Sequence, residues 1–422
     1  MAKKASKKTG KKTSKATPRR AASAASHKKI SKKGAKRKPP ATPKADPGAK
    51  ALEGLRKQID QLDRRLIRLL NDRASLAKSI GKVKRSQPDG DRKIYASDRE
   101  ALVLDRILKA NEGPLPARSI EAIYREIMSG MIALEQPVRI GFLGPAGSHS
   151  HDAAIRHFGR SVELVFEDVH TISGVFDEVA RGNIDYGLVP IENSTGGGVV
   201  DTLDAFLEFG QDVTIYAEVQ IEIHHCLLAQ CGPKDIKRIY SKPDVFAQCK
   251  KWLGDQMSGR ELIDAPSSSR AVQIAVEENK KLASLGYPMT TAAIGNRLAG
   301  EAYGLDELFE SIEDKANNIT RFFVIGKEQA GQTGDDKTSI MFTTDDRAGA
   351  LVEVLGVFHA AGVNLSHIDK RPSGRENWTY TFFCDALGHR DESVMSAALA
   401  RAGAHCKELR VLGSYPRSKR IL

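Results

Sequence analysis

Apolar residues recur at three-, four- and seven-residue spacing between Ala51 and Val83, and this pattern predicts one long amphipathic helix. The apolar stripe consists of Leu55, Ile59, Leu62, Leu66, Leu69, Leu76, Ile80 and Val83. Two shorter helices are predicted around Ser97–Asn111 and Ala117–Glu135, separated by the Gly-Pro-Leu-Pro breaker at 113–116. At about 1.5 Å per residue the long helix spans roughly 50 Å, more than the width of a small domain. The stripe therefore needs a partner, either the two following helices or another subunit.

After Pro137 the pattern changes to short apolar strands that run into polar or glycine-rich turns and then into helices. Four stretches show it: VRIGFLGPAGSHSHDAAIRHFG, DYGLVPIENSTGGGVVDTLDAF, IYSKPDVFAQC and DAPSSSRAVQIA. In α/β sheets the ends of such strands are where ligands bind. The repetition predicts two α/β lobes that close on one ligand.

The stretch NITRFFVIG would return the chain to the same cleft, with Thr320 and Arg321 ahead of a buried strand. An arginine beside a core strand is costly unless it meets an anion. Gly144, Gly147 and Ser148 at a helix start form a second candidate anion site, built from backbone N–H groups. Their spacing fits no dinucleotide or phosphate-loop motif, so no nucleotide is predicted.

The last part of the chain follows the linker KEQAGQTGDDK and alternates strands with two helices. Strands are predicted near 338–343, 363–368, 378–385 and 409–412, and helices over 349–361 and 393–402. This βαββαβ order predicts a ferredoxin-like α+β sandwich. It carries no nucleophile or acid–base cluster, so a binding role is expected.

Composition changes the picture at the N-terminus. The chain has 422 residues and a net charge of +12, but residues 1–50 contain 18 Lys and Arg against the single acid Asp46. The remainder is mildly acidic. A tail of Lys, Ala, Ser, Thr, Pro and Gly cannot bury a core. It either binds nucleic acid or another polyanion through counterion release, or is a solvated extension. A transit peptide is a third alternative, although such peptides favour Arg over Lys.

Cysteine usage and hydropathy bear on location. The five cysteines form no CxxC pair and no His/Cys cluster, which favours a reducing compartment and argues against structural zinc. No apolar run approaches the roughly 20 residues that span a bilayer, and the N-terminus lacks a signal-peptide core. A cytoplasmic protein without a metal or other cofactor is predicted. The adjacent His224 and His225 lie in a strand pattern and face opposite ways, so we interpret them as structural, the alternative being that one supports the cleft.

The segment LRKQIDQLDRRLIRLLNDRASLAKSIGKVK, followed by DREALVLDRIL, resembles the all-helical chorismate mutase family over nearly all of residues 51–136. The resemblance implies an intertwined dimer that converts chorismate to prephenate by holding a dianion in a reactive conformer. It also implies a site in which cationic side chains bind the two substrate carboxylates and the ether oxygen. Acidic side chains in the same site would contact the ring hydroxyl or the ether oxygen. The positions implied are Arg56 of the other subunit, Arg73, Lys84, Arg99, Glu100 and Glu135.

Two positions depart from that family. Ala96 stands where many members have Asp, and Glu135 stands where some have Gln as a second donor to the ether oxygen. A carboxyl group donates only when protonated, so mutase activity is expected to be better at lower pH. An impaired mutase domain is the alternative.

The motifs GFLGPAGSHSHDAA, VPIENSTGGGVVDTLDAF, AAIGNRLAGEAYGL and NITRFFVIG strongly resemble prephenate dehydratase over residues 138–327. The resemblance implies a fold like a two-lobed periplasmic binding protein, which removes water and carbon dioxide from prephenate to give phenylpyruvate. Thr320 would bond the leaving hydroxyl, Arg321 would pair with a substrate carboxylate, and Glu192 is the other candidate acid. Further cleft positions are Asn193, Ser148, Ser194, Ser241, Gln248 and Ser268. Lys242 stands where a His is usual.

The segment GALVEVLGVFHAAGVNLSHIDKRPS resembles the ACT regulatory domain of phenylalanine-sensing enzymes, within residues 336–422. The resemblance implies that two copies pair and bind L-phenylalanine at their interface. The positions implied are Gly349, Ala350, Leu351, Val352, Asp369, Arg371 and Pro372. Lys370 replaces the serine common in the family.

Together the three resemblances predict a bifunctional chorismate mutase/prephenate dehydratase that is inhibited by L-phenylalanine and is at least dimeric. Two alternatives stay open on the sequence. One is a dehydratase with an impaired mutase domain, and the other is a catalytically inactive phenylalanine-sensing regulator. Intact Thr320-Arg321 and Glu192-Asn193 pairs argue against the second.

Overall fold

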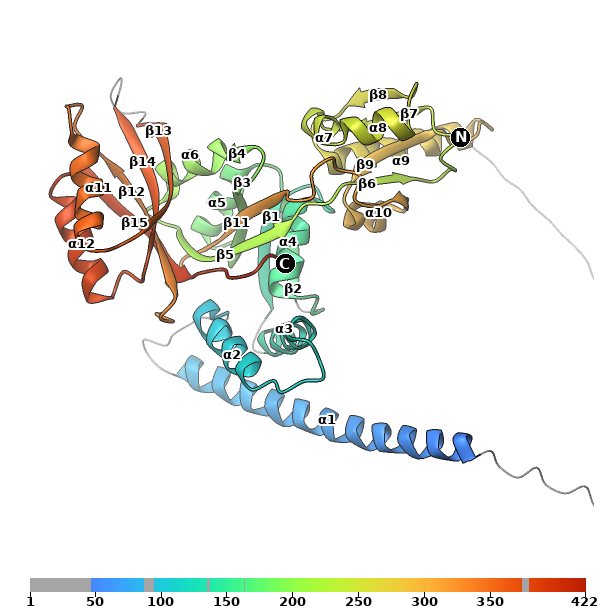
Figure 1. Cartoon of the computed structure of the whole chain (residues 1–422), viewed down its shortest axis with the longest axis horizontal. Coiled ribbons are helices and arrows are strands. Elements are labelled where there is room, and N and C mark those ends of the chain that lie inside the picture. Colours follow the sequence, from blue (N-terminus) through green and yellow to red (C-terminus); the bar gives the residue numbers. More distant parts are fainter. Residues whose placement is uncertain (1–46, 87–94, 135–136, 163, 374–378) are drawn as a thin grey trace, which may run out of the picture. The chain divides into compact units, whose positions relative to one another are not determined.

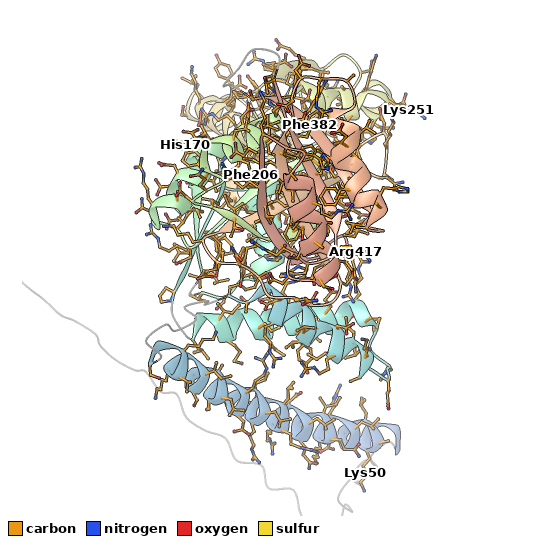
Figure 2. The ribbon with its side chains drawn as sticks, turned by 90° about the vertical axis from the view of Figure 1, so that its left-hand side faces the viewer. Lys50, His170, Phe206, Lys251, Phe382 and Arg417 are labelled. Carbon is orange, nitrogen blue, oxygen red and sulfur yellow. The ribbon has the colours of Figure 1, made fainter. Side chains whose placement is uncertain are left out.

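The structure is a computed structural model that describes residues 47–86, 95–134, 137–162, 164–373 and 379–422. The N-terminal part is helical, as predicted, with α1 (Pro47–Ser86), α2 (Ser97–Lys109) and α3 (Ala117–Ala133). Most of the described side chains of α1 are exposed (Figure 2). Leu66, Leu69 and Leu76 are each more than half exposed, at 53%, 62% and 66%. Helices α2 and α3 therefore do not cover this part of the stripe.

The start of α2 is fixed to the α/β domain by one aromatic residue. Tyr95 is 2% exposed and makes edge-on ring contacts with Phe158, Tyr186 and Tyr216. Its carbonyl oxygen accepts hydrogen bonds from the hydroxyls of Tyr186 and Tyr216, and Ser97 Oγ donates to the Tyr216 carbonyl at 2.9 Å. Buried aromatic rings with satisfied hydroxyls make such a contact strong.

The α/β domain has two lobes, each with its own sheet (Figure 1). The first-lobe sheet has the order β2-β1-β3-β11-β5, with β4 (Gly197–Gly198) beside β3. Its other elements are β1 (Val138–Leu143), α4 (His149–Phe158), β2 (Leu164–Val169), α5 (Ile172–Arg181), β3 (Tyr186–Asn193), α6 (Val200–Phe209), β5 (Thr214–Glu222) and β11 (Ile319–Gly326). Strands β1, β2 and β3 are parallel, whereas β11 runs antiparallel to both of its neighbours.

The second-lobe sheet has the order β10-β6-β9-β7-β8. Its elements are β6 (Cys226–Ala229), β7 (Arg238–Ser241), α7 (Pro243–Gln248), α8 (Lys250–Gln256), β8 (Glu261–Asp264), α9 (Ser268–Ser284), β9 (Thr291–Gly295), α10 (Arg297–Tyr303) and β10 (Asp306–Phe309). The chain enters this lobe between β5 and β6 and leaves it between β10 and β11. The two crossings lie side by side, because Ile223 N donates to the Asn318 carbonyl at 2.7 Å.

The C-terminal domain has the predicted βαββαβ order in a sheet arranged β13-β14-β12-β15. Its elements are β12 (Asp336–Thr343), α11 (Ala350–Ala360), β13 (Leu365–Pro372), β14 (Tyr380–Leu387), α12 (Ser393–Gly403) and β15 (Glu408–Pro416). Residues on the sheet, among them Met341, Phe383, Leu412 and Tyr415, pack into the hydrophobic core of the first lobe. The last strand is longer than its sequence pattern predicts, because residues 413–416 continue to pair with β12. Across the described residues, we find no helix with both the length and the apolar character that crossing a bilayer requires.

Candidate active site

The pairing of β3 with β11 sorts the predicted cleft residues into two groups. Thr320 lies opposite Asn193, and Arg321 lies opposite Glu192. Directly opposed residues point to the same face of a sheet, and successive residues along a strand point to opposite faces. Thr320 and Asn193 therefore share one face, while Arg321 and Glu192 share the other. The sequence predicts that all four meet one ligand, and the structure brings them together only in pairs.

The first pair belongs to a cluster of polar side chains at the crossing between the lobes. Asn193 Nδ2 donates to Thr320 Oγ1 and to Asn318 Oδ1, both at 2.8 Å. Asn193 Oδ1 accepts from the backbone N–H groups of Thr195 and Gly196 at 2.9 and 2.8 Å. Thr320 is 8% exposed. Its hydroxyl oxygen is thus held in place by the Asn193 amide.

The second lobe contributes Gln248 to this cluster. Gln248 Oε1 lies 3.1 Å from Asn318 Nδ2 and 2.7 Å from His225 Nε2. Gln248 Nε2 lies 3.5 Å from Thr195 Oγ1. The backbone of this region is fixed too, since Glu313 Oε2 accepts from the His225 N–H at 2.9 Å. We call Asn193, Thr195, His225, Gln248, Asn318 and Thr320 the polar cluster.

The predicted serines act mainly as caps and local braces. Ser148 Oγ donates to the Leu143 carbonyl and caps α4, accepting from a backbone N–H. Ser194 Oγ accepts from the Ile319 N–H at 3.0 Å, at the edge of the polar cluster. Ser241 is fully buried and donates to a backbone carbonyl. Ser268 opens α9. Among these four, Ser194 lies nearest in sequence and bonding to the polar cluster.

Arg321 is engaged on the opposite face by acids and a phenol. Its Nε donates to Glu218 Oε2 at 2.9 Å, and its Nη2 bonds Asp385 and lies 3.3 Å from Tyr415 Oη. Lys337 Nζ also bonds Glu218, at 3.0 Å. Asp385, Tyr415 and Lys337 come from the C-terminal domain, so the network joins that domain to β11. We call Glu218, Arg321, Lys337, Asp385 and Tyr415 the Arg321 network.

Glu192 also faces the C-terminal domain. Its Oε2 lies 3.7 Å from Arg321 Nη1 and 3.5 Å from His367 Nδ1 on β13. The carboxylate side chain is 39% exposed. An acid in this position lies at the domain junction, on the sheet face opposite Thr320. In the second lobe, Lys242 at the start of α7 pairs with Asp244 at 2.7 Å on the surface.

The predicted mutase residues are spread over α1 and α2. Arg73 and Lys84 are partly exposed on α1, and Arg99 is exposed in the first turn of α2. Arg56 is exposed on the N-terminal part of α1. Glu135 lies outside the described residues. Ala96 is the N-cap of α2 and makes no side-chain cap.

Glu100 lines a cavity of about 610 Å³ between α2, α3 and the C-terminal segment 416–422. Burial raises the pKa of the Glu100 carboxyl to about 7, against the opposing pull of Arg125. The C-terminal segment is tied down here, since Arg420 pairs with Glu121 on α3 and Leu422 N donates to Gln220 O at 2.8 Å. The cavity thus combines a carboxyl group whose pKa lies near neutral pH with cationic side chains.

The predicted effector residues lie at the start of α11 and on β13. Gly349 is the N-cap of α11 with φ of 85°, a conformation that favours glycine. Ala350 is buried, whereas Val352 is 70% exposed and Leu351 lies between them in exposure. Arg371 Nε and Nη2 bond Asp204 on α6 at 2.7 and 2.8 Å. Asp369 and Pro372 are on the same strand.

The sequence pattern predicts that the two adjacent histidines lie in a strand, but the structure places them in the connection between β5 and β6, where their side chains have different partners. His224 Nδ1 lies 2.8 Å from Glu313 Oε1, and His225 bonds Gln248. Within the described ranges, no group of three or more His, Cys, Asp or Glu side chains is arranged to hold a metal ion. Sequence reasoning left His225 as a structural residue, named neither Asn318 nor Thr195, and missed Glu218 and Asp385. A buried acid such as Glu218 in the apolar strand pattern IYAEVQIE is the signal that could have pointed to the network.

Two α/β lobes meet at a polar cluster, with helices before them and a βαββαβ domain after them. This architecture defines a multidomain protein with a two-lobed α/β domain. Family models agree along the chain: chorismate mutase type II matches residues 55–136, prephenate dehydratase matches 140–330, and the ACT domain matches 338–404. The three models match the chain in the same order as the helical, two-lobed and C-terminal domains occur in the structure.

Named relatives span nearly the whole chain. A bifunctional chorismate mutase/prephenate dehydratase of Stutzerimonas stutzeri is 41% identical over 374 residues, 88% of this chain and 99% of the relative. Its Pseudomonas aeruginosa counterpart is 40% identical over 87% of this chain and 98% of the relative. The solved prephenate dehydratase of Arthrobacter aurescens in complex with L-Phe is 32% identical, with a TM-score of 0.60 over 68% of this chain and 92% of that chain. The chain belongs to the family of bifunctional chorismate mutase/prephenate dehydratases.

Proposed function

We propose that the polar cluster is the dehydratase site and that Thr320 acts in it as a hydrogen-bond donor. The observation that carries this is the contact of Asn193 Nδ2 with Thr320 Oγ1 at 2.8 Å. Because the amide nitrogen donates, the hydroxyl oxygen accepts, and the Thr320 proton is left to point at a substrate atom. Conversion of added prephenate to phenylpyruvate by the purified chain tests the assignment, and no conversion contradicts it.

The chemistry asks for such a donor. The C–O bond to the ring hydroxyl and the C–C bond to the ring carboxylate break, the ring becomes aromatic, and one proton is taken up to release water and carbon dioxide. Thr320 hydrogen-bonds the departing oxygen, and the proton comes from solvent through it. A threonine is a weak acid, so aromatisation and loss of carbon dioxide provide most of the driving force. A fixed donor on a leaving oxygen contributes a rate factor on the order of 10²–10³.

Besides substrate binding, Arg321 and Glu192 have a second proposed role, which is to join the dehydratase sheet to the C-terminal domain. That Arg321 pairs with a prephenate carboxylate and that Glu192 serves as an acid stay predictions from the family resemblance. The contacts with Glu218, Asp385 and His367 support a role in joining the dehydratase sheet to the C-terminal domain. Variants of Arg321 separate these roles, as described in the Discussion.

The helical domain is assigned the mutase step, in which chorismate rearranges to prephenate without a covalent intermediate. Arg73, Lys84 and Arg99 supply cations, and Arg56 is supplied by a second copy. A second copy also provides a cover for the apolar stripe of α1, which burial would favour by about 25 cal/mol per Å². We therefore infer a homodimer, which sedimentation of the purified chain tests.

The mutase site is expected to lose kcat/KM as the pH falls through the pKa of the Glu100 carboxyl, which is about 7. Ionised Glu100 accepts a hydrogen bond from the ring hydroxyl, so its protonation lowers activity. Glu100→Gln is expected to remove this acid limb, measured as chorismate consumption between pH 5 and 8. The opposite trend, higher activity at lower pH, is expected if a protonated Glu135 donates to the ether oxygen. A flat wild-type profile would contradict both assignments.

The C-terminal domain is assigned the sensing of L-phenylalanine, the amino acid made from the dehydratase product. The solved relative from Arthrobacter aurescens holds this ligand, and the ACT model matches residues 338–404. The site would use the turn from Gly349 to Val352 and the Asp369–Pro372 segment of β13. Feedback requires that L-phenylalanine bind one state of the enzyme more tightly than the other.

The basic tail and the cytoplasmic location also stay predictions. Residues 1–46 of the tail lie outside the described residues, and residues 47–50 form the start of α1. Binding of a polyanion through counterion release is salt-dependent. Retention of the full chain on DNA at two salt concentrations, compared with a chain lacking residues 1–46, tests it.

A further inference from the structure

The backbone fixes the direction of every hydrogen bond in the polar cluster. The N–H groups of Thr195 and Gly196 can only donate, and both point at one side-chain atom of Asn193. That atom must be the amide oxygen, so the Asn193 NH₂ group faces the other way, toward Asn318 and Thr320. An amide placed by two backbone donors cannot flip without losing both bonds.

The same logic carries through the next two side chains. Asn318 meets a donor at Asn193, so its oxygen points there and its NH₂ group points at Gln248, 3.1 Å from Oε1. Gln248 therefore presents its oxygen to Asn318. The same oxygen lies 2.7 Å from His225 Nε2, which must then carry a proton. This series of hydrogen bonds begins at the two backbone N–H groups and ends at His225, and it fixes the His225 tautomer as the one protonated on Nε2.

His225 is built into the protein around this one bond. It is 2% exposed, its backbone N–H is held by Glu313, and burial lowers its pKa, so the ring is neutral. The other ring nitrogen, Nδ1, has no hydrogen-bond partner among the described residues. The group that packs against the ring is His149, whose centroid lies 5.9 Å away and whose pKa burial lowers to about 3. The neutral His225 ring therefore has one hydrogen-bonded nitrogen, Nε2, which donates to the Gln248 oxygen from a fixed position.

We propose that His225 is a positioning residue of the dehydratase reaction, which holds the Gln248 oxygen and so turns the Gln248 NH₂ group toward the solvent-accessible side of the cluster. This rests on the dehydratase function proposed above. Gln248 Nε2 lies 3.5 Å from Thr195 Oγ1, an exposed residue. The site then offers two donors, the Gln248 amide and the Thr320 hydroxyl, to a substrate that carries two carboxylates and a leaving hydroxyl. A flipped Gln248 would present an oxygen to an anion and repel it.

The test compares variants that keep or remove the donor. His225→Gln places an amide NH₂ near the position of Nε2, whereas His225→Met keeps the bulk without a donor. His225→Asn keeps polarity but does not reach Gln248, and serves if the Met variant fails to fold. We expect His225→Met and His225→Asn to lower kcat for prephenate about tenfold with a smaller change in KM, and His225→Gln to stay within roughly threefold of wild type.

A double-mutant cycle separates positioning from simple structural support. In a Gln248→Ala background there is no amide to orient, so His225→Met is expected to cost nothing further. His224→Gln is the matched control, since that side chain is the neighbouring histidine, is 43% exposed and bonds Glu313. Chorismate consumption by the same preparations reports whether the chain is folded.

The outcomes discriminate between the inference and the function on which it rests. Wild-type chain that fails to convert prephenate contradicts the dehydratase assignment. Wild-type conversion with an unchanged His225→Met variant, or an equal additional loss in the Gln248→Ala background, overturns the positioning role alone. Rescue by His225→Gln together with a non-additive cycle supports it.

Discussion

Replacing Thr320 with valine is expected to lower kcat for prephenate by a factor of about 10²–10³ while chorismate consumption stays near the wild-type rate. Valine keeps the shape of the side chain and removes the hydroxyl that would bond the leaving oxygen. Thr320 is 8% exposed, and Asn193 Nδ2 retains its bond to Asn318, so the fold should tolerate the change. Phenylpyruvate formation and chorismate loss, followed separately on one preparation, measure the effect.

Thr320→Ser is the matched control, since it restores a hydroxyl at the same position. We expect it to recover most of the dehydratase rate. Loss of both reactions in Thr320→Val would show that the two sites are not separate, and an undiminished dehydratase rate would remove Thr320 from the reaction.

Replacing Arg321 with methionine is expected to destabilise the junction between the first lobe and the C-terminal domain by about 3–5 kcal/mol. Breaking a buried ion pair by removing one partner costs about that much because the other charge stays buried and unpaired. Here the Glu218 and Asp385 side chains are 0% and 4% exposed. Lys337 still pairs with Glu218, so Asp385 is the group left without a counter-charge. We expect the midpoint of thermal unfolding to fall by roughly 10 °C.

The matched control is Arg139→Met, which removes an arginine that bonds Glu167 at 2.7 Å on the surface. Exposed pairs are worth about 0–1 kcal/mol, so its midpoint should barely move. If Arg321 instead binds substrate, Arg321→Met keeps a wild-type unfolding midpoint and raises KM for prephenate. That result would support a role for Arg321 in substrate binding and would contradict its role in stabilising the junction.

Much of the architecture was predictable because it is written in local patterns. The 3.6-residue period of α1, the breaker at 113–116 and the βαββαβ order each depend on residues close in sequence. Boundaries agree within a few residues except at the ends of β13 and β15, which both run past their predicted ends because they continue to pair with neighbouring strands. Thr320 and Asn193 were found by motif and are joined directly by a hydrogen bond.

The rest of the site depends on contacts that no local pattern carries. A motif shows that Thr320 and Arg321 are adjacent, but only strand alternation and the register with β3 show that they face opposite sides. Asp385 and Tyr415 reach Arg321 from more than 60 residues away in the chain, a separation at which sequence gives no distance. The strand pattern around His225 predicts a structural residue, because the hydrogen bond of its side chain to Gln248 in the second lobe exists only in the folded chain.

The most direct test of the whole account is one coupled assay on the purified chain. Chorismate is supplied, and its loss and the gain of phenylpyruvate are followed separately, with and without L-phenylalanine. The account predicts both changes, with phenylpyruvate formation suppressed by L-phenylalanine. Turnover of added prephenate but not of chorismate would confine catalysis to the two-lobed domain and implicate Ala96 or Glu135. No turnover of either substrate, with L-phenylalanine still bound, would contradict the account and favour a regulator that has lost catalysis.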